Sequence, residues 1–344
     1  METNLTSQKH TPKDYKNGSA VRWCPGCGDH AILNCLHKAF AELNLEPHEI
    51  AVISGIGCSS RLPYYMNTYG LHGIHGRAAA IATGVKVANP DLSVWVTTGD
   101  GDSLAIGGNH FIHAIRRNVD INIILFNNKI YGLTKGQYSP TSEKGFISKS
   151  SPYGTVEEPF NPAELCFGAR GTFFGRAIDV DLNNLTDLLT ASAKHKGTAV
   201  VEVLQNCVIF NNGIHSKITD KAYRPERTIW LQHGKKMLFG FNNEKGIVAD
   251  ANLQLKAVTI GQDGYTLDDV LVHDAATKDS TLHLKLAQMG YDNDLPVALG
   301  VIRDVEAPTF ENEYEKQIEE VQKKMPVKSF TEFLMNSKNT WELK

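Results

Sequence analysis

The sequence predicts an α/β protein with a mostly parallel, doubly wound sheet, helices on both faces of that sheet, and an α+β extension after it. Apolar runs of strand length recur at 50–53, 93–98, 121–126 and 198–204. Continuous apolar runs are typical of parallel strands that are buried on both faces. Segments with the three- and four-residue spacing of amphipathic helices separate them, which is the alternation of a βαβ fold.

Length and composition set the domain organisation. A chain of 344 residues with 42% hydrophobic and 21% charged residues can bury a large core. We expect a flexible N-terminal segment over 1–20, a main domain over 21–215 and a C-terminal extension over 216–344. The extension is expected to pack against the domain or to contact another subunit.

The helices of the main domain are predicted by apolar spacing. One helix follows Cys27 and carries Cys35 on its apolar face, a second begins at Ala78, and a third runs from Leu104 to Ile115. A short helix is indicated by the cap Asn161 with a proline in the first position. The segment 139–159 has three prolines and little periodicity, and we expect a long mobile loop there.

The extension shows weaker patterns. A hairpin is predicted over 236–250, a short helix over 267–273, a strand over 297–301 and a charged helix over 311–324. In that last helix the glutamates at 319 and 320 stand four residues before lysines, which suits a solvated face.

Two polar motifs follow neighbouring strands. Gly99-Asp100-Gly101-Asp102 follows the run at 93–98, and Asn127-Asn128 follows the run at 121–126. The carboxyl ends of parallel strands meet at one sheet edge, so these oxygens should lie together. Carboxylate and amide oxygens suit Mg²⁺, which accepts its remaining ligands from water and phosphate groups. The flanking glycines and the next helix's N-terminus favour a bound phosphate.

These two segments resemble the diphosphate-and-metal motif of thiamine diphosphate enzymes. The resemblance implies a diphosphate-binding domain of the thiamine diphosphate-binding fold. It also implies that Asp100, the Asn128 side chain and the Ile130 carbonyl ligate Mg²⁺.

The six cysteines fall into two groups. Cys35 and Cys166 lie on apolar helix faces and are expected in the core. The other four are candidate ligands, and they are Cys24, Cys27, Cys58 and Cys207. A thioredoxin-like pair at 24–27 is disfavoured because no strand precedes it. By geometry alone the four could hold zinc or a [4Fe-4S] cluster. Because these cysteines are expected at the sheet edge beside the cofactor, a [4Fe-4S] cluster that accepts electrons is favoured over a structural zinc ion.

With both patterns, the chain resembles the β subunit of the 2-oxoacid:ferredoxin oxidoreductases over about 20–215, and the 2-oxoglutarate branch looks nearest. The motifs that carry the resemblance are Trp23-Cys-Pro-Gly-Cys-Gly28, Gly55-Ile-Gly-Cys-Ser59, His72-Gly-Ile-His-Gly-Arg-Ala78 and Gly99-Asp-Gly-Asp102, with Cys207 as the fourth cluster ligand. The implied reaction is oxidative decarboxylation of a 2-oxoacid with coenzyme A. Thiamine diphosphate, Mg²⁺ and a [4Fe-4S] cluster are the implied cofactors, and ferredoxin accepts the electrons.

The resemblance also implies site residues. Those expected to bind the cofactors are Gly55, Ile56, Gly57, Cys58, Ser59, His75, Gly99, Asp100, Gly101, Asp102, Asn128, Ile130, Tyr131, Gly132, Leu133 and Thr134. Arg61 and His75 are the candidate catalytic residues. Because a guanidinium binds a carboxylate in a bidentate manner, Arg61 favours a dicarboxylic 2-oxoacid over pyruvate.

Three alternatives remain open at this point. One is a pyruvate or broad-specificity enzyme of the same family, another is a non-redox thiamine diphosphate decarboxylase with structural cysteines, and the third is a non-catalytic scaffold with a Cys₄ zinc site. No second α/β unit is evident that could bind the aminopyrimidine. The chain is therefore expected to be active only with an α subunit that carries the pyrimidine-binding domain.

Other functions are disfavoured by charge and hydropathy. The formal net charge of −3 gives no electrostatic case for nucleic acid or anionic lipid. No apolar run approaches the ~20 residues that span a bilayer, and residues 1–18 lack the apolar centre of a signal peptide. We therefore expect a cytoplasmic protein.

Overall fold

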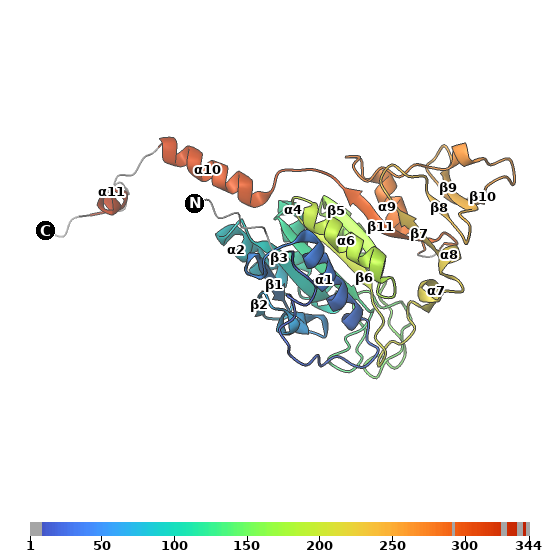
Figure 1. Ribbon diagram of the computed structural model, residues 1–344, viewed down its shortest axis with the longest axis horizontal. Coiled ribbons are helices and arrows are strands. Elements are labelled where there is room, and N and C mark those ends of the chain that lie inside the picture. Colours follow the sequence, from blue (N-terminus) through green and yellow to red (C-terminus); the bar gives the residue numbers. More distant parts are fainter. Residues whose placement is uncertain (1–8, 291–292, 325–328, 336–339, 342–344) are drawn as a thin grey trace.

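The computed structural model describes residues 9–290, 293–324, 329–335 and 340–341. Its centre is an eight-stranded sheet in the order β2-β1-β3-β4-β6-β5-β11-β7 (Figure 1). The strands are β1 (Ile50–Ser54), β2 (Tyr69–His72), β3 (Ser93–Gly99), β4 (Ile121–Asn127), β5 (Phe173–Ile178), β6 (Ala199–Leu204), β7 (Thr228–Leu231) and β11 (Val297–Asp304).

The first six strands of the chain are parallel to one another. Only β11 runs antiparallel to its neighbour β5, and β7 runs parallel to β11. Every residue of β1, β4, β5 and β6 is buried. The predicted mostly parallel α/β sheet is therefore confirmed.

Helices cover both faces of the sheet. On one face α1 (Asp29–Leu43) packs against α6 (Leu182–Lys194). The other face is covered by α2 (Ala78–Ala88), α4 (Gly108–Arg117), α5 (Pro162–Gly168) and α9 (Thr281–Gln288). Strand β3 contributes side chains to the hydrophobic cores on both faces of the sheet. Trp95 packs on the face that α1 covers, and Val94 and Val96 pack on the other face.

The predicted helix from Leu104 to Ile115 is interrupted. A short helix, α3 (Asp100–Leu104), precedes α4, and Ile106 between them is 54% exposed. A Cβ on Gly107 would lie 2.4 Å from the Asp102 carbonyl oxygen, so the backbone turns sharply there. This turn brings Gly107 against Gly76, a contact between segments that helical spacing does not report.

The N-terminal segment expected to be flexible is anchored where the structure describes it, from residue 9 onward. Tyr15 is fully buried, and its hydroxyl donates to the carbonyls of Phe40 and Leu45 at 3.0 and 2.7 Å. Lys16 forms an isolated bridge with Met66. Residues 1–8 lie outside the described part of the chain.

The C-terminal region is less separate than the predicted boundary at 215 suggests, because β7 and β11 extend the main sheet. The predicted hairpin is present in an antiparallel sheet of β8 (Leu238–Phe239), β9 (Lys245–Ala249) and β10 (Leu255–Thr259). In place of the helix predicted over 267–273 there is a single 3₁₀ turn, Leu267–Asp269. Two very short helices, α7 (Ser216–Thr219) and α8 (Arg224–Arg227), link the domain to this region.

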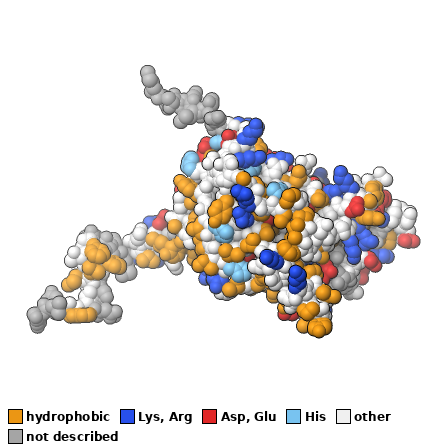
Figure 2. Space-filling view, turned by 90° about the horizontal axis from the view of Figure 1, so that it is seen from below, with side chains coloured by type: hydrophobic (Ala, Val, Ile, Leu, Met, Phe, Trp, Pro, Cys, Tyr) orange, Lys and Arg blue, Asp and Glu red, His pale blue; other side chains and the backbone are white. Residues whose placement is uncertain are grey.

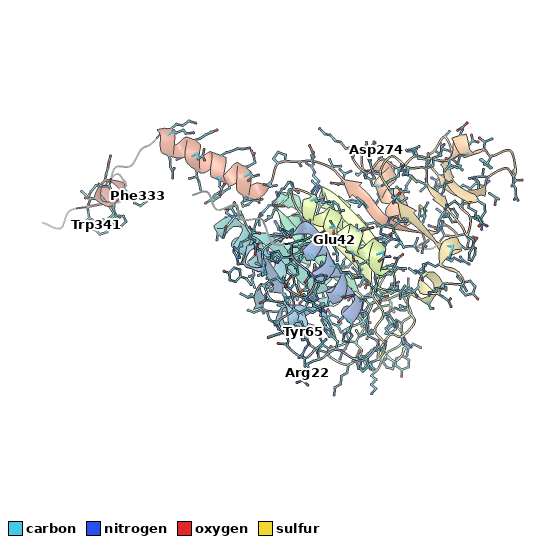
Figure 3. The ribbon with its side chains drawn as sticks, in the orientation of Figure 1. Arg22, Glu42, Tyr65, Asp274, Phe333 and Trp341 are labelled. Atoms are coloured by element: carbon cyan, nitrogen blue, oxygen red, sulfur yellow. The ribbon has the colours of Figure 1, made fainter. Side chains whose placement is uncertain are left out.

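The predicted charged helix is α10 (Phe310–Lys324), with its lysine–glutamate pairs at 3.8 and 3.9 Å. It extends away from the body and leads to α11 (Phe330–Met335) (Figure 1). Figure 3 places Phe333 and Trp341 on this arm, and Tyr65 and Arg22 at the loop-bearing end of the sheet. Among the residues described, no helix combines the length and apolar character needed to cross a lipid bilayer.

Candidate functional site

A cavity of about 480 Å³ opens where the carboxyl ends of β1, β3 and β4 meet. Its lining contains most of the predicted cofactor residues, namely Ile56, Gly57, Cys58, Ser59, His75, Gly99, Asp100, Gly101, Asp102, Asn128, Ile130, Tyr131, Gly132, Leu133 and Thr134, together with Phe126 and Gln137. Figure 2 views this end of the molecule, where hydrophobic side chains are spread among Lys, Arg and His. The Gly99-Asp100-Gly101-Asp102 motif and the Asn127-Asn128 motif are therefore brought together at this end of the sheet.

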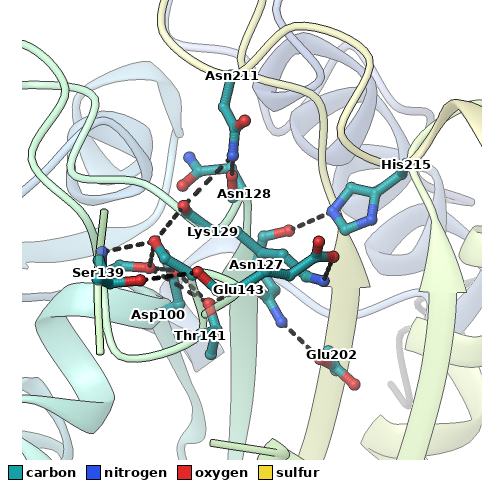
Figure 4. A network of polar contacts seen from close by, with 12 residues as sticks. Asp100, Asn127, Asn128, Lys129, Ser139, Thr141, Glu143, Glu202, Asn211 and His215 are labelled. Atoms are coloured by element: carbon teal, nitrogen blue, oxygen red, sulfur yellow. Dashed lines mark hydrogen bonds and ion pairs between the residues drawn. The ribbon is translucent and has the colours of Figure 1, made fainter. Parts of the chain in front are cut away.

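Asp100 lies at the bottom of this site as the first residue of α3. Its side chain is 2% exposed, and burial raises its pKa to about 6 despite hydrogen bonds that act in the opposite direction. Its Oδ2 accepts hydrogen bonds from the hydroxyls of Ser139 and Thr141 at 2.5 and 2.6 Å (Figure 4). These hydroxyls orient the carboxylate.

Sequence reasoning missed Ser139 and Thr141, and it gave no separate role to Asn127 of the Asn127-Asn128 motif. The first two belong to the segment expected to be a mobile loop, yet both are buried. Asn127 is the last residue of β4, and its Oδ1 lies 2.9 Å from Oγ1 of Thr141. The hydroxyl-rich run at 139–142 is the one signal that could have drawn attention to them.

Asn128 and Ile130 line the same cavity as Asp100, the first residue of α3. The Asn128 Oδ1 accepts the Ile130 N–H at 3.2 Å, and Asn211 Nδ2 donates to the Asn128 carbonyl at 2.9 Å. With Asp100 they offer a carboxylate, an amide and a carbonyl oxygen to one cavity. This is a donor set of the kind Mg²⁺ takes in proteins, so the residues fit the predicted ion.

Asp102 has a different place from Asp100, because its carboxylate joins three segments. It accepts hydrogen bonds from the backbone N–H groups of Ile56 and Gly76 at 3.0 and 2.7 Å, and from the Thr98 hydroxyl at 2.7 Å. Nδ1 of His75 also lies 2.7 Å from it. Asp102 is therefore placed to hold the loops around the cavity.

Glycines let the backbone approach closely at two places. A Cβ on Gly101 would lie 2.2 Å from the Tyr131 ring, whose hydroxyl donates to the Gly101 carbonyl at 2.9 Å. A Cβ on Gly55 would lie 2.0 Å from Oδ2 of Asp102, and Gly57 has a φ of +125°. The walls of the cavity thus depend on residues without side chains.

Two of the candidate cluster cysteines meet beside Gly132. A Cβ on Gly132 would lie 3.5 Å from Sγ of Cys207 and 3.6 Å from Sγ of Cys58. The Trp23 indole N–H donates to the Cys58 carbonyl at 2.7 Å, which ties the 24–27 segment to the same place. Gly132 and Cys58 both line the cavity.

The four thiols are close enough to influence one another electrostatically. Burial raises the pKa of Cys58 to about 12, and the neighbouring Cys207 and Cys24 add to that shift. Burial likewise raises the pKa of Cys27, with further contributions from Cys58 and Cys207. Across the described ranges, however, no three His, Cys, Asp or Glu side chains have the spacing of a single-ion site.

The remaining cysteines lie in the core, as expected. Cys35 is fully buried and its thiol donates to the Leu182 carbonyl at 3.3 Å. Cys166 is fully buried in α5, which has the predicted Asn161 cap.

Arg61 is not brought into the cavity. It lies in a 3₁₀ helix, Ser59–Tyr65, where its Nε donates to the Tyr65 hydroxyl at 3.2 Å. Its positive charge lowers the pKa of the nearby Cys58 thiol, in opposition to burial. Arg61 therefore acts electrostatically on Cys58 and is not among the residues that line the cavity.

Comparisons with known proteins agree on this region. The family model described as thiamine pyrophosphate enzyme, C-terminal TPP binding domain, matches residues 55–203. The chain is 46% identical over 337 residues to the 2-oxoglutarate oxidoreductase subunit KorB of Mycobacterium tuberculosis, covering 98% of this chain and 89% of that relative. It is 50% identical over 205 residues to the β subunit of 2-oxoacid:ferredoxin oxidoreductase 1 of Aeropyrum pernix, covering 59% and 64% of the two chains.

A solved structure is similar over nearly the whole chain. It is the 2-oxoglutarate:ferredoxin oxidoreductase from Magnetococcus marinus with 2-oxoglutarate, coenzyme A and succinyl-CoA bound. The TM-score is 0.76 at 31% sequence identity, and the match covers 97% of this chain and 98% of that one. The similarity therefore extends through the C-terminal region.

Proposed function

Because the chain belongs to the β subunits of the 2-oxoacid:ferredoxin oxidoreductases, in the 2-oxoglutarate branch, we propose that it binds thiamine diphosphate, Mg²⁺ and a [4Fe-4S] cluster. The proposed complex converts 2-oxoglutarate and coenzyme A to succinyl-CoA and CO₂, and ferredoxin takes up the electrons. It works in the cytoplasm, where the six free cysteines of this chain fit a reducing compartment.

One observation carries this proposal. The cavity that holds the oxygen donors Asp100 and Asn128 is also lined by Cys58 and Gly132, and Gly132 is flanked by the sulfurs of Cys58 and Cys207. A cofactor held by those oxygens would lie next to a group held by those sulfurs. Short separation is what electron transfer between the two requires.

Within this site Asp100, Asn128 and the Ile130 carbonyl are the proposed Mg²⁺ ligands. The glycines at 99 and 101 and the first turn of α3 would offer backbone N–H groups to the diphosphate. Bound thiamine diphosphate would supply the carbon nucleophile for decarboxylation of the 2-oxoacid. The chain's own part would be to bind and orient the cofactor, and the loop over 131–137, which lines the cavity, would limit the access of water to it.

A [4Fe-4S] cluster is favoured over zinc for the four cysteines. The sulfurs of Cys58 and Cys207 flank Gly132, which lines the cavity proposed for thiamine diphosphate. A [4Fe-4S] cluster at that place could accept electrons from the cofactor, whereas a structural zinc ion has no redox role.

A partner subunit is favoured by the surface near the cavity. Exposed hydrophobic side chains lie on segments around the cavity, and they are Ile56, Ile74, Ile106 and Leu133 on loops and Tyr64 in the 3₁₀ helix Ser59–Tyr65. Exposed apolar side chains gathered at one end of a molecule are typical of interaction sites. We propose that an α subunit with the pyrimidine-binding domain covers it and completes the active site.

The test is to purify the chain with its α subunit under anaerobic conditions. We expect iron and sulfide in the preparation, together with reduction of ferredoxin or methyl viologen that depends on 2-oxoglutarate, coenzyme A and thiamine diphosphate. A preparation with zinc and no iron would contradict the cluster. Faster reduction with pyruvate or branched 2-oxoacids than with 2-oxoglutarate would contradict the substrate.

A further inference from the structure

A row of polar side chains crosses the buried middle of the sheet and ends at Asp100 (Figure 4). Arg176 Nη1 donates to the Ala287 carbonyl in α9 at 3.2 Å, and Arg176 Nε donates to Glu202 at 2.6 Å. Asn127 Nδ2 donates to the other oxygen of Glu202 at 2.7 Å. Thr141 then connects Asn127 to Asp100. The row therefore joins the C-terminal region to the proposed metal ligand.

Stability alone does not account for the charged pair in this row. Arg176 and Glu202 are both fully buried and face each other in the register of β5 and β6. Removing two charges from water is costly, and apolar replacements of a buried pair are often neutral or stabilising. A pair of charges in the most buried strands therefore calls for another role.

The charges set the orientation of Asn127. A carboxylate can only accept hydrogen bonds, so Asn127 must present its Nδ2 group to Glu202. Its Oδ1 then faces Thr141, at 2.9 Å from Oγ1. If Asn127 were reversed, its Oδ1 would face the carboxylate of Glu202, and two acceptors would meet in the buried middle of the sheet.

Thr141 links Asn127 to Asp100. Its Oγ1 lies 2.9 Å from Asn127 Oδ1 and 2.6 Å from Asp100 Oδ2, and its one hydroxyl proton is shared between these two acceptors, with the shorter contact to Asp100. Ser139 donates to the same Oδ2. The two hydroxyls fix the position of Oδ2, and with it the direction in which the carboxylate can present its other oxygen to a metal ion. Partners of this kind, one step from the metal, fix the direction of a ligand.

We propose that Arg176, Glu202, Asn127 and Thr141 are positioning residues that orient the Asp100 carboxylate for the Mg²⁺ ion of the bound diphosphate. This inference rests on the proposed function. It also gives the C-terminal region a role in the site, because the Ala287 carbonyl at the end of α9 holds one end of the row.

The test measures, by calorimetry, how the binding of thiamine diphosphate to the purified α–β complex depends on the Mg²⁺ concentration. In Thr141→Val the side chain keeps its shape and loses the hydroxyl. We expect the Mg²⁺ requirement to rise by roughly 10–100-fold, as for other groups that orient a metal ligand. Thr141→Ser restores the hydroxyl and should restore binding close to that of the wild type.

The matched control is Thr97→Val. Thr97 is fully buried in the neighbouring part of β3, and its hydroxyl has no hydrogen-bond partner among the described atoms. Loss of that hydroxyl should leave the Mg²⁺ dependence unchanged. Glu202→Gln, checked for folding by circular dichroism, tests the far end of the row and should also weaken Mg²⁺ binding. If this variant fails to fold, the Thr141 pair still decides.

The outcomes distinguish a failure of this inference from a failure of the proposed function. An unchanged Mg²⁺ requirement in Thr141→Val, with normal binding by the wild type, would overturn the inference and leave the proposed function intact. Equal losses in Thr141→Val and Thr141→Ser would overturn it too, since the hydroxyl would not be the cause. A wild-type complex that never binds thiamine diphosphate would overturn the proposed function and this inference with it.

Discussion

Nδ1 of His75 lies 2.7 Å from Oδ1 of Asp102, at the point where the loops around the cavity meet. A carboxylate can only accept, so Nδ1 carries a proton, and in the neutral ring Nε2 is the acceptor. His75 lines the cavity, so its second nitrogen is the one that can act on a ligand. Asp102 thereby fixes both the ring and the backbone that surrounds it.

Asp102→Asn should destabilise the chain, because an amide cannot accept all the hydrogen bonds that the carboxylate accepts. We expect a loss of about 2–4 kcal/mol in the free energy of unfolding, measured by urea denaturation and circular dichroism at low protein concentration. Asp91→Asn, a change at an exposed position, is the control and should have little effect. Similar unfolding midpoints for the two variants would show that Asp102 does not hold the loops.

Cys207→Ala should abolish or strongly reduce the iron content of the complex and its visible absorption, because it removes one of four thiolate ligands. Cys35→Ala is the matched control, since that thiol is buried in the core and donates to a carbonyl. The measurement is iron and sulfide analysis after anaerobic purification. Equal iron in both variants would remove Cys207 from the ligand set.

Gly101→Ala should weaken thiamine diphosphate binding. The added methyl group would meet the Tyr131 ring at 2.2 Å, so the ring must move away from the wall of the cavity. Gly84→Ala is the control, because nothing lies within 4 Å of a Cβ there. In the interior of α2 this second change should add about 0.5–1 kcal/mol of stability and leave binding unchanged.

The chain should lose stability in mild acid, in part through His37. This side chain is 2% exposed in α1, no hydrogen-bond partner is present for either nitrogen in the described structure, and burial lowers its pKa to about 4. The unfolded chain therefore binds a proton that the folded chain does not, and stability falls as the pH drops from about 6.5 toward 4.

His37→Leu should remove that part of the acid sensitivity. At pH 5 we expect a gain of about 1–2 kcal/mol relative to the wild type, beyond any difference at pH 7.5. Urea denaturation at the two pH values is the measurement. The same difference between variant and wild type at both pH values would exclude protonation of His37 as the cause.

Arg61→Gln tests the sequence-based prediction that this residue binds the second carboxylate of the substrate, although Arg61 does not line the cavity. If the guanidinium binds that group, kcat/KM for 2-oxoglutarate should fall roughly 10–100-fold, with little change for pyruvate. Arg22→Gln is the control at a nearby exposed arginine (Figure 3). An equal fall in kcat/KM for both 2-oxoacids would instead indicate an effect through Cys58, because the charge of Arg61 also lowers the pKa of that thiol.

The sheet and most of the cavity lining could be predicted because they depend on local patterns. Asp100 and Asn128 each follow a strand whose apolar run is visible in the sequence, and parallel strands must end at one edge. The same rule predicted that Cys58 and Cys207 would approach each other. In these cases the apolar runs locate the strands, and the end of each strand locates the residue that follows it.

The remainder depends on contacts between distant segments. Ser139 and Thr141 reach Asp100 across about forty residues of sequence, and no periodic pattern marks such a contact. Strand β11 enters the sheet antiparallel to β5 from more than a hundred residues away. Tyr15 likewise owes its burial to α1. Propensity reports none of these contacts, since tertiary packing decides them.

Strand β2 has a consequence for how the protein is produced. It forms the outer margin of the sheet, and all four of its residues are exposed, Tyr69 and Leu71 among them. A bare strand margin with apolar side chains is a template for pairing with another chain, and so for aggregation. Synthesis of this subunit in excess of its partner would therefore favour insoluble aggregates, and balanced co-expression protects the yield.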